Sequence, residues 1–494
     1  MKLKTYQWLL IIIAFSLLLR LIFFTGSDSS DELEYYKFAN QANHGAFELG
    51  ADHFKFRVGT FYPTALFFRI FGVNEFSGNL LTLLTSIFGI VLIYFLGTHF
   101  FNEKAGLIAA FLLSFYPLDV VYATRLLPDI PSAFFMGLGV LLFLYGEKYR
   151  KKQNAYYLFS GIALGIAYLI KEVSLIMGLF FAAYFIYKKK FKLNYLLLGI
   201  GLGAAILFLM IYSYAHSGDP FFQYKANEQQ QIGFMKALYK NYFTTQGLIS
   251  RLFLHYPYYM LTDAHYGLFF IFVGVSILYF LYRRKEETYV PIIWMLSLLL
   301  YLNFGTISLK QYVPFPVIIR HLSIITFPAL VLVAYFIENF EYPSKLSKFS
   351  KRTLNQNGKI MGYSKFSITE IKIKKLNALI TGLLLFSSLF FIYSSHLRHD
   401  IDNVRLAFNY ISNNPEKAVY TDERTYRILD YLFEFKRSDV LPFNNYDYYN
   451  YENPNKNLMI MELKKVKNSY IVINSDILAR LPLTYSDMKF PREI

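Results

Sequence analysis

The chain has 494 residues, 55% of them hydrophobic, and a formal net charge of +16. A soluble globular protein of this length could not bury so much apolar side-chain surface, so the composition excludes that class. The absence of Cys excludes structural disulfides and thiolate metal sites. The basic residues cluster in short runs between apolar segments, which follows the positive-inside rule and argues against nucleic-acid binding.

Apolar runs recur along the chain and have the length of membrane-spanning helices, about 20 residues or slightly fewer with polar flanks. The first run follows Lys2 and Lys4, as in a signal peptide, but no small-residue cleavage site follows it, so a retained first span is predicted. The pattern predicts about eleven transmembrane helices. They lie near residues 7–25, 78–97, 105–118, 131–146, 156–170, 173–187, 194–213, 266–282, 289–304, 321–337 and 377–394.

Alternation of these spans places the N-terminus and every strong basic cluster on one face, which is therefore predicted to be cytoplasmic. The basic clusters lie at 148–152, 188–192 and 283–285 and within the polar stretch 338–376. The polar stretch is predicted to be a cytoplasmic linker that contacts anionic lipid headgroups. The extracytoplasmic face receives the loops 26–77, 119–130, 214–265 and 305–320.

The C-terminal segment 395–494 is polar and rich in Asn, Asp and Tyr. Strand-like pieces at 417–420 and 469–474 flank a helix-like stretch at 423–433 that has apolar positions at helical spacing. The predicted fold is an α-helical polytopic membrane protein, with a transmembrane domain at 1–394 and a small extracytoplasmic α/β domain at 395–494. Such a protein belongs in the cell membrane, with membrane lipids as its immediate partners and no nucleic acid.

Acidic residues stand directly after the first span, at Asp31 and Glu32, and Tyr35 follows them. One interpretation is a solvated cap that starts a short interfacial helix. The other is a carboxylate that is held against the membrane and acts as a general base toward a hydroxyl or an amine. The acids alone do not decide between these interpretations.

Further ionisable residues fall on the same predicted face. They are Arg57, Arg125, Asp129, Lys171, Glu172, Arg320 and His321. Each alone is explained as a residue at headgroup level, but charges near the membrane plane are costly unless they are paired or hydrated, so the set favours a shared aqueous cavity. Carboxylates combined with Arg and Lys suit an anionic leaving group, because a basic side chain holds a phosphate while a carboxylate deprotonates the acceptor. A phosphate tethered to a lipid would reach such a cavity laterally from the bilayer.

Short motifs run through residues 1–340. In chain order they are Asp31-Glu32-x-x-Tyr35-x-x-x-Ala39, Arg57-Val-Gly-Thr-Phe-Tyr-Pro63 followed by Phe71-Gly72-Val-Asn-Glu75, Arg125-Leu-Leu-Pro128-Asp129-Ile-Pro131, Gly161 through Ala167 with Lys171, and Arg320-His-Leu with Pro328. Together they resemble the GT-C glycosyltransferases that use polyprenyl-phosphate sugars, in the branch of the protein O-mannosyltransferases and the lipid A aminoarabinose transferases. The chain departs from that family at Arg57 and Tyr62-Pro63, where many members have His-Pro-Pro or Lys-Pro-Pro, and at His321, where Tyr is usual.

The resemblance implies sugar transfer, with inversion, from a dolichyl- or undecaprenyl-phosphate donor to a protein, lipid or glycan acceptor on the extracytoplasmic face. Asp31 would be the catalytic base, and Glu32 a neighbouring catalytic carboxylate that orients the acceptor or the base. The residues implied for the acceptor side or as a second carboxylate are Asp129, Tyr35 and Glu172, and those implied for the donor phosphate are Arg57, Lys171 and Arg320.

No cofactor is predicted. Asp31, Glu32, Asp129, His255 and His265 share the predicted outer face, but the two His lie in a long loop without the spacing of metal ligands, so no divalent metal is predicted. Two other functions stay open. A transporter or a flippase for lipid-linked sugars would use the charges as a pathway, although the internal repeats common in transporters are not evident. A scaffold that presents the C-terminal domain would leave the outer-face charges without a purpose.

Overall fold

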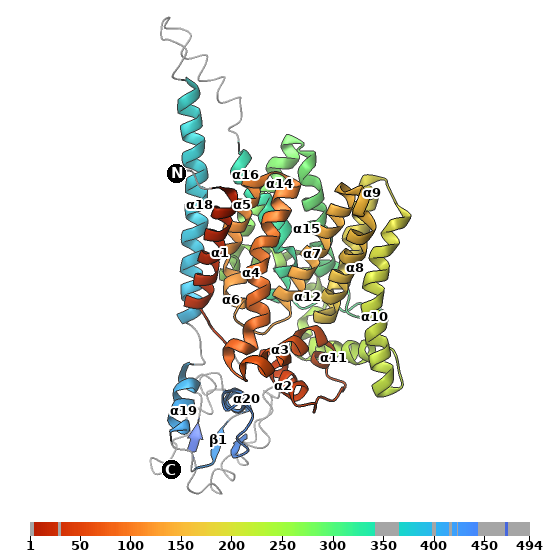
Figure 1. The fold of residues 1–494 in the computed structure, drawn as a ribbon, viewed down its shortest axis with the longest axis vertical. Helices are drawn as coiled ribbons and strands as arrows, with labels where there is room; N and C mark the ends of the chain where they lie inside the picture. The colour runs from red at the N-terminus through yellow and green to blue at the C-terminus, as the bar shows by residue number, and fades with distance from the viewer. Residues whose placement is uncertain are drawn as a thin grey trace, which may run out of the picture.

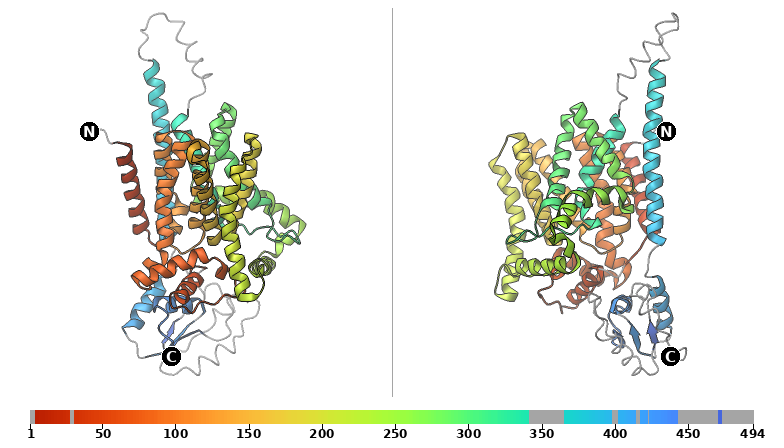
Figure 2. Two further views of the ribbon diagram at one scale, coloured as in Figure 1. Left: turned by 45° about the vertical axis from the view of Figure 1, so that its right-hand side comes forward. Right: turned by 180° about the vertical axis from the view of Figure 1, so that it is seen from behind.

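The structure is a computed structural model that describes residues 4–27, 31–340, 365–397, 402–413, 417–421, 423–442 and 470–472. Most of it is a bundle of helices that run side by side, with short helices and a small sheet gathered at one end (Figures 1 and 2). This arrangement confirms the predicted α-helical polytopic fold.

Each predicted span coincides with a helix of the bundle. In chain order these helices are α1 (Thr5–Ile22), α4 (Glu75–Phe100), α5 (Glu103–Ser114), α7 (Asp129–Lys148), α8 (Gln153–Ile170), α9 (Met177–Lys188), α10 (Leu196–Ser217), α14 (Phe269–Arg283), α15 (Tyr289–Phe304), α16 (Thr326–Asn339) and α18 (Lys365–Leu397). In the part of the chain that the structure describes, seven of them are long and apolar enough to cross a membrane, and α5, α8, α9 and α14 are shorter or less apolar. Helix α18 begins well before the predicted start of its span at 377, inside the stretch predicted to be a linker, whose residues 341–364 lie outside the described residues.

Side-chain contacts distinguish the two ends of the bundle. At one end, Lys192 pairs with Glu147 at 2.7 Å, and the Tyr335 hydroxyl donates to Glu287 at 2.7 Å. The basic clusters follow α7, α9 and α14 at this end. The short helices of the first loop and the C-terminal strands lie at the opposite end (Figure 1). The alternation of spans predicted this separation of the basic clusters from the acidic first loop.

The charged residue of the first apolar run, Arg20, is satisfied inside the protein. Its side chain is fully buried. The guanidinium pairs with Asp119 at 2.5 Å and donates to the Ser86 hydroxyl at 2.6 Å and to the Ser114 carbonyl at 3.0 Å. These partners lie on α4, α5 and α6 (Pro117–Tyr122), so Arg20 joins α1 to three other helices. A charge within a membrane protein is tolerated when it is paired in this way.

Helices α8 and α10 approach each other closely where their glycines meet. A Cβ atom on Gly161 would lie 2.1 Å from the carbonyl oxygen of Leu198, and one on Gly201 would lie 2.6 Å from the backbone nitrogen of Ile162. Small residues permit this approach between membrane helices. The contact fixes α8, at whose end Lys171 emerges.

The loop segments at the end opposite the basic clusters are largely helical. The first loop forms α2 (Asp31–Asn43), the 3₁₀ turn η1 (His53–Phe56) and α3 (Val58–Phe71). The segment 214–265, predicted only as a loop, forms α11 (Phe222–Leu238), η5 (Lys240–Phe243), α12 (Thr245–Ser250), the π-helical turn η6 (Arg251–His255) and α13 (Tyr256–Thr262). Two further 3₁₀ segments matter for the site, η3 (Glu172–Ile176) and η9 (Ile319–Ile325).

The C-terminal unit, defined as the described residues between 402 and 472, is a small α/β structure. It comprises α19 (Asp402–Ser412), β1 (Val419–Thr421), α20 (Glu423–Leu432), β2 (Val440–Pro442) and β3 (Tyr470–Val472). The strands are parallel in the order β2-β1-β3, with Val419 opposite both Val440 and Tyr470. Both predicted strands and the predicted helix are present. Strand β2 was not predicted, because its short sequence ends in Pro, a residue that disfavours strands.

Candidate functional site

Asp31 is the first residue of α2. Glu32 and Glu34 share the first turn of α2, where acids are stabilised by the positive end of the helix dipole. The Asp31 side chain is 27% exposed, and its carboxylate contacts the guanidinium of Arg320. Glu32 is fully buried. The acid after the first span therefore both starts a helix and faces a cation.

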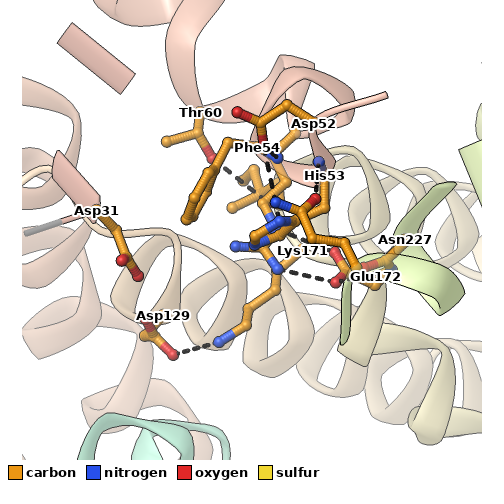
Figure 3. Close-up of polar contacts among 12 residues, drawn as sticks. Asp31, Asp52, His53, Phe54, Thr60, Asp129, Lys171, Glu172 and Asn227 are labelled. Carbon is orange, nitrogen blue, oxygen red and sulfur yellow. Dashed lines mark hydrogen bonds and ion pairs between the residues drawn. The ribbon is translucent and has the colours of Figure 1, made fainter. Parts of the chain in front are cut away.

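Arg320 lies between two carboxylates. Its Nη2 atom donates to Asp31, and its Nε atom lies 3.4 Å from Oδ2 of Asp129. Asp129 is the first residue of α7 and is almost completely buried. The Lys171 ammonium, from the end of α8, donates to the other oxygen of Asp129 at 2.6 Å, and Figure 3 shows this contact beside Asp31. We call Asp31, Arg320, Asp129 and Lys171 the charge network.

A second ion pair, Arg57 with Glu172, lies next to the charge network, because Glu172 directly follows Lys171 in the chain. The guanidinium of Arg57 donates to both oxygens of Glu172, at 2.8 and 3.1 Å, and to the Tyr35 hydroxyl at 2.8 Å. Burial favours the neutral form of Glu172, but the charge and hydrogen bonds of Arg57 outweigh it and hold the pKa of the carboxyl well below its usual range. Burial raises the pKa of Tyr35, although Arg57 opposes the change, so the phenol is neutral.

Sequence reasoning missed the residues that support this pair from α11 and η1. Asn227 donates to Glu172 at 3.3 Å (Figure 3). The backbone N–H of His53 donates to the side chain of Gln230 at 2.8 Å. Burial, and then the charge of Arg57, lower the pKa of His53, which therefore stays neutral near pH 7. The only available signal was the polar run 227–231, which interrupts an otherwise aromatic segment.

Three other residues assigned to the outer face have partners of their own. Arg125 donates to the Thr25 hydroxyl at 3.3 Å. His255 bonds to the Tyr242 hydroxyl at 2.9 Å, and His265 bonds to Asp263 at 2.9 Å. Within the described ranges, no cluster of three or more His, Cys, Asp or Glu side chains is suited to hold a metal ion.

The six central side chains balance in charge, with carboxylates at Asp31, Asp129 and Glu172 and cations at Arg57, Lys171 and Arg320. An incoming phosphate would compete with these carboxylates for the cations. Asp31 is the most readily displaced partner in the charge network, because its side chain is 27% exposed and that of Asp129 only 3%. The arrangement can therefore bind an anion at Arg320 and release a carboxylate in the same step.

Comparisons with known proteins agree with this architecture. Residues 58–214 match the family model described as dolichyl-phosphate-mannose-protein mannosyltransferase. The fold is similar to that of ArnT from Cupriavidus metallidurans in the apo state, with a TM-score of 0.59, 13% identity, and coverage of 96% of this chain and 94% of that one. ArnT bound to undecaprenyl phosphate gives a TM-score of 0.55 with 13% identity, covering 96% of this chain and 91% of that one.

The apo oligosaccharyltransferase of Archaeoglobus fulgidus gives a TM-score of 0.57 with 13% identity, covering 98% of this chain and 68% of that chain. No curated protein sequence matches the chain. At these identities the structural similarity establishes the fold, and the family model adds sequence similarity over α3 to α10. The fold and the matched segment together confirm the resemblance of this integral membrane protein to the GT-C superfamily and its mannosyltransferase-like members.

Proposed function

We propose that this protein is a membrane glycosyltransferase that moves a sugar from a polyprenyl-phosphate carrier to a protein, lipid or glycan acceptor. The reaction takes place at the end of the bundle that carries Asp31, on the extracytoplasmic side, and inverts the anomeric carbon. The match to a dolichyl-phosphate-mannose family and the fold shared with ArnT, which has been solved with undecaprenyl phosphate, support a lipid-linked donor.

The observation that carries the proposal is the contact of Asp31 with Arg320 inside the charge network. A base and a phosphate-binding cation stand within hydrogen-bond reach of each other, and Lys171 is held nearby through Asp129. Sugar transfer from a phosphate requires both groups around one anomeric carbon. The contact of Asp31 with Arg320 places the proposed base beside the proposed phosphate-binding cation.

In the proposed reaction, an acceptor hydroxyl or amide attacks the anomeric carbon of the donor. The bond between that carbon and the phosphate oxygen breaks, and the acceptor proton passes to Asp31. The polyprenyl phosphate leaves with one more negative charge than it had in the donor, and Arg320 and Lys171 stabilise this charge. Arg57 contributes its positive potential from the adjoining pair with Glu172, whose two hydrogen bonds hold the guanidinium in place.

The test uses the Asp31→Asn variant, because Asn keeps the shape of the side chain and loses the basic oxygen. With a radiolabelled polyprenyl-phosphate sugar in membranes, the variant is expected to transfer sugar about 100-fold or more slowly than the parent, the usual effect of removing a general base. Asp219→Asn is the matched control, since Asp219 pairs with the exposed Lys225 away from the charge network.

Two results would contradict the proposal. Asp31→Asn could transfer sugar at the parental rate, which would exclude Asp31 as the base. Alternatively, the parent protein could move lipid-linked sugar into sealed vesicles without changing its covalent linkage, which would identify a transporter.

A further inference from the structure

The C-terminal unit contacts α2, the first-loop helix that carries Asp31. Tyr431 of α20 stacks on Tyr36 of α2 with ring centroids 4.1 Å apart and an interplanar angle of 7°. Both rings are almost completely buried. Next to this stack, Arg427 of α20 pairs with Glu34 of α2 at 2.6 Å. The C-terminal unit therefore contacts two successive turns of α2.

The stack belongs to a hydrophobic core that the C-terminal unit shares with the first loop. This core is separate from the core of the bundle. Its buried members include Tyr36, Phe38 and Phe61 from the first loop and Leu429 and Val440 from the C-terminal unit. Helix α2 therefore packs on the C-terminal unit as one element of a common core, in which each side loses apolar contacts if the other moves.

A second connection fixes the chain just before α2. Arg405 of α19 donates to the carbonyl of Thr25 and to Glu75, each at 2.8 Å. Glu75 in turn accepts a hydrogen bond from the backbone N–H of Ser27 at 3.2 Å. The C-terminal unit thus holds both the approach to α2 and the helix itself.

On α2, Asp31 and Tyr35 are four residues apart and lie on one side of the helix. Tyr35 reaches Arg57, and Asp31 reaches Arg320. Glu32 and Tyr36 each follow these residues by one position, so they lie on the adjacent face of the helix. A movement of α2 at Tyr36 must therefore displace Asp31 relative to Arg320.

We propose that the C-terminal unit is the positioning element for the proposed base, with Tyr431 as its main positioning residue. This inference rests on the proposed function. The exposed Arg427 pair adds little, because ion pairs of partly exposed side chains contribute weakly. The buried stack of Tyr431 on Tyr36 carries the effect.

The experiment measures sugar transfer by the full-length protein in membranes for Tyr431→Ala and Tyr431→Phe. Tyr431→Ala removes the ring and is expected to lower kcat about 10-fold to 100-fold, as misplaced reacting groups do, with the KM for the lipid-linked donor within about twofold of the parent. Tyr431→Phe keeps the ring and is expected to restore kcat to within about twofold of the parent.

Gly78 tests the same contact from the membrane side. A Cβ atom there would lie 2.6 Å from the Tyr431 hydroxyl and 2.7 Å from Cε1 of Tyr36, so Gly78→Ala forces the stacked rings to move. Gly203→Ala is the matched control, because a Cβ atom on that helical glycine meets nothing within 4 Å. Hydrogen exchange of α2 peptides supplies a readout independent of activity. It is expected to speed up in Tyr431→Ala and Gly78→Ala and to stay at the parental rate in Gly203→Ala.

The outcomes separate this inference from the proposed function. If the parent transfers no sugar, the proposed function fails, and the exchange of α2 still reports whether the C-terminal unit holds that helix. If the parent transfers sugar and Tyr431→Ala keeps the parental kcat, or raises only the donor KM, the positioning role is overturned. Unchanged exchange of α2 in both Tyr431→Ala and Gly78→Ala would overturn it as well.

Discussion

At the scale of single residues, Asp129 is the carboxylate that both cations of the charge network share. It accepts a hydrogen bond from Lys171 and lies 3.4 Å from Arg320. Asp129→Asn would leave Lys171 as a buried cation without its counter-ion and would leave Arg320 paired with Asp31 alone. We expect kcat to fall about 10-fold or more, since the base is less available, and the donor KM to fall too, because the added positive charge attracts phosphate.

Steady-state kinetics of sugar transfer with the purified variant in nanodiscs measures both constants. Size-exclusion chromatography confirms that the measured fraction is folded, and Asp219→Asn again serves as the control. A parental kcat, or a higher donor KM, would show that Asp129 does not set the charge balance of the site.

The sequence predicted which residues share the site but not how they pair. The predicted topology put Asp31, Asp129, Lys171 and Arg320 at the same end of the bundle, and the structure brings them into contact. Their pairing joins segments far apart in sequence, as with Arg320 and Asp31, and depends on how the helices pack. No local pattern reports that packing, and for the same reason the support of Glu172 by Asn227 was not foreseen.

At the scale of elements, the packing of α3 on α8 determines where Arg57 meets Glu172. Gly59 lies in the first turn of α3, and a Cβ atom there would come within 2.8 Å of Cγ1 of Ile170 and 2.9 Å of its backbone nitrogen. We expect Gly59→Ala to separate the two helices at this point and to destabilise the fold by about 1–3 kcal/mol, as overpacking of tight contacts does.

Thermal unfolding followed by fluorescence-detected size exclusion measures the change as a lower Tm than that of the parent. Gly199→Ala in α10 is the control, because a Cβ atom there meets nothing within 4 Å. If Gly59→Ala unfolds at the parental temperature, the approach of α3 to α8 does not constrain the site.

The elements that sequence analysis identified well have a strong local signal. The spans are long apolar runs, helix α20 has apolar positions at helical spacing, and β1 and β3 lie in strand-like pieces, and each was found close to its observed position. Helices α11 to α13 were missed, because their aromatic and polar residues alternate without one apolar face. Their helical form depends on contacts with the rest of the bundle, such as the hydrogen bonds of buried Arg251 with Phe315 and Leu302.

At the scale of the whole molecule, the distribution of charge predicts the orientation in the membrane. The basic clusters lie at one end of the bundle, and the charge network lies at the other, so the positive-inside rule predicts that the network faces away from the cytoplasm. The chain contains no Cys, so a single introduced Cys reports its own accessibility without background.

Leu309→Cys and Lys190→Cys test this orientation. Leu309 is 86% exposed in the loop before Arg320, and Lys190 is exposed in the basic cluster after α9. A membrane-impermeant maleimide applied to intact cells is expected to label Leu309→Cys and to label Lys190→Cys only after permeabilisation, while the parent chain stays unlabelled. The reverse pattern would place the charge network on the cytoplasmic side, where a donor would have to present its phosphate to the opposite leaflet. Labelling of both variants in intact cells would instead show that the reagent had crossed the membrane, and the same pair would then be repeated in sealed right-side-out vesicles.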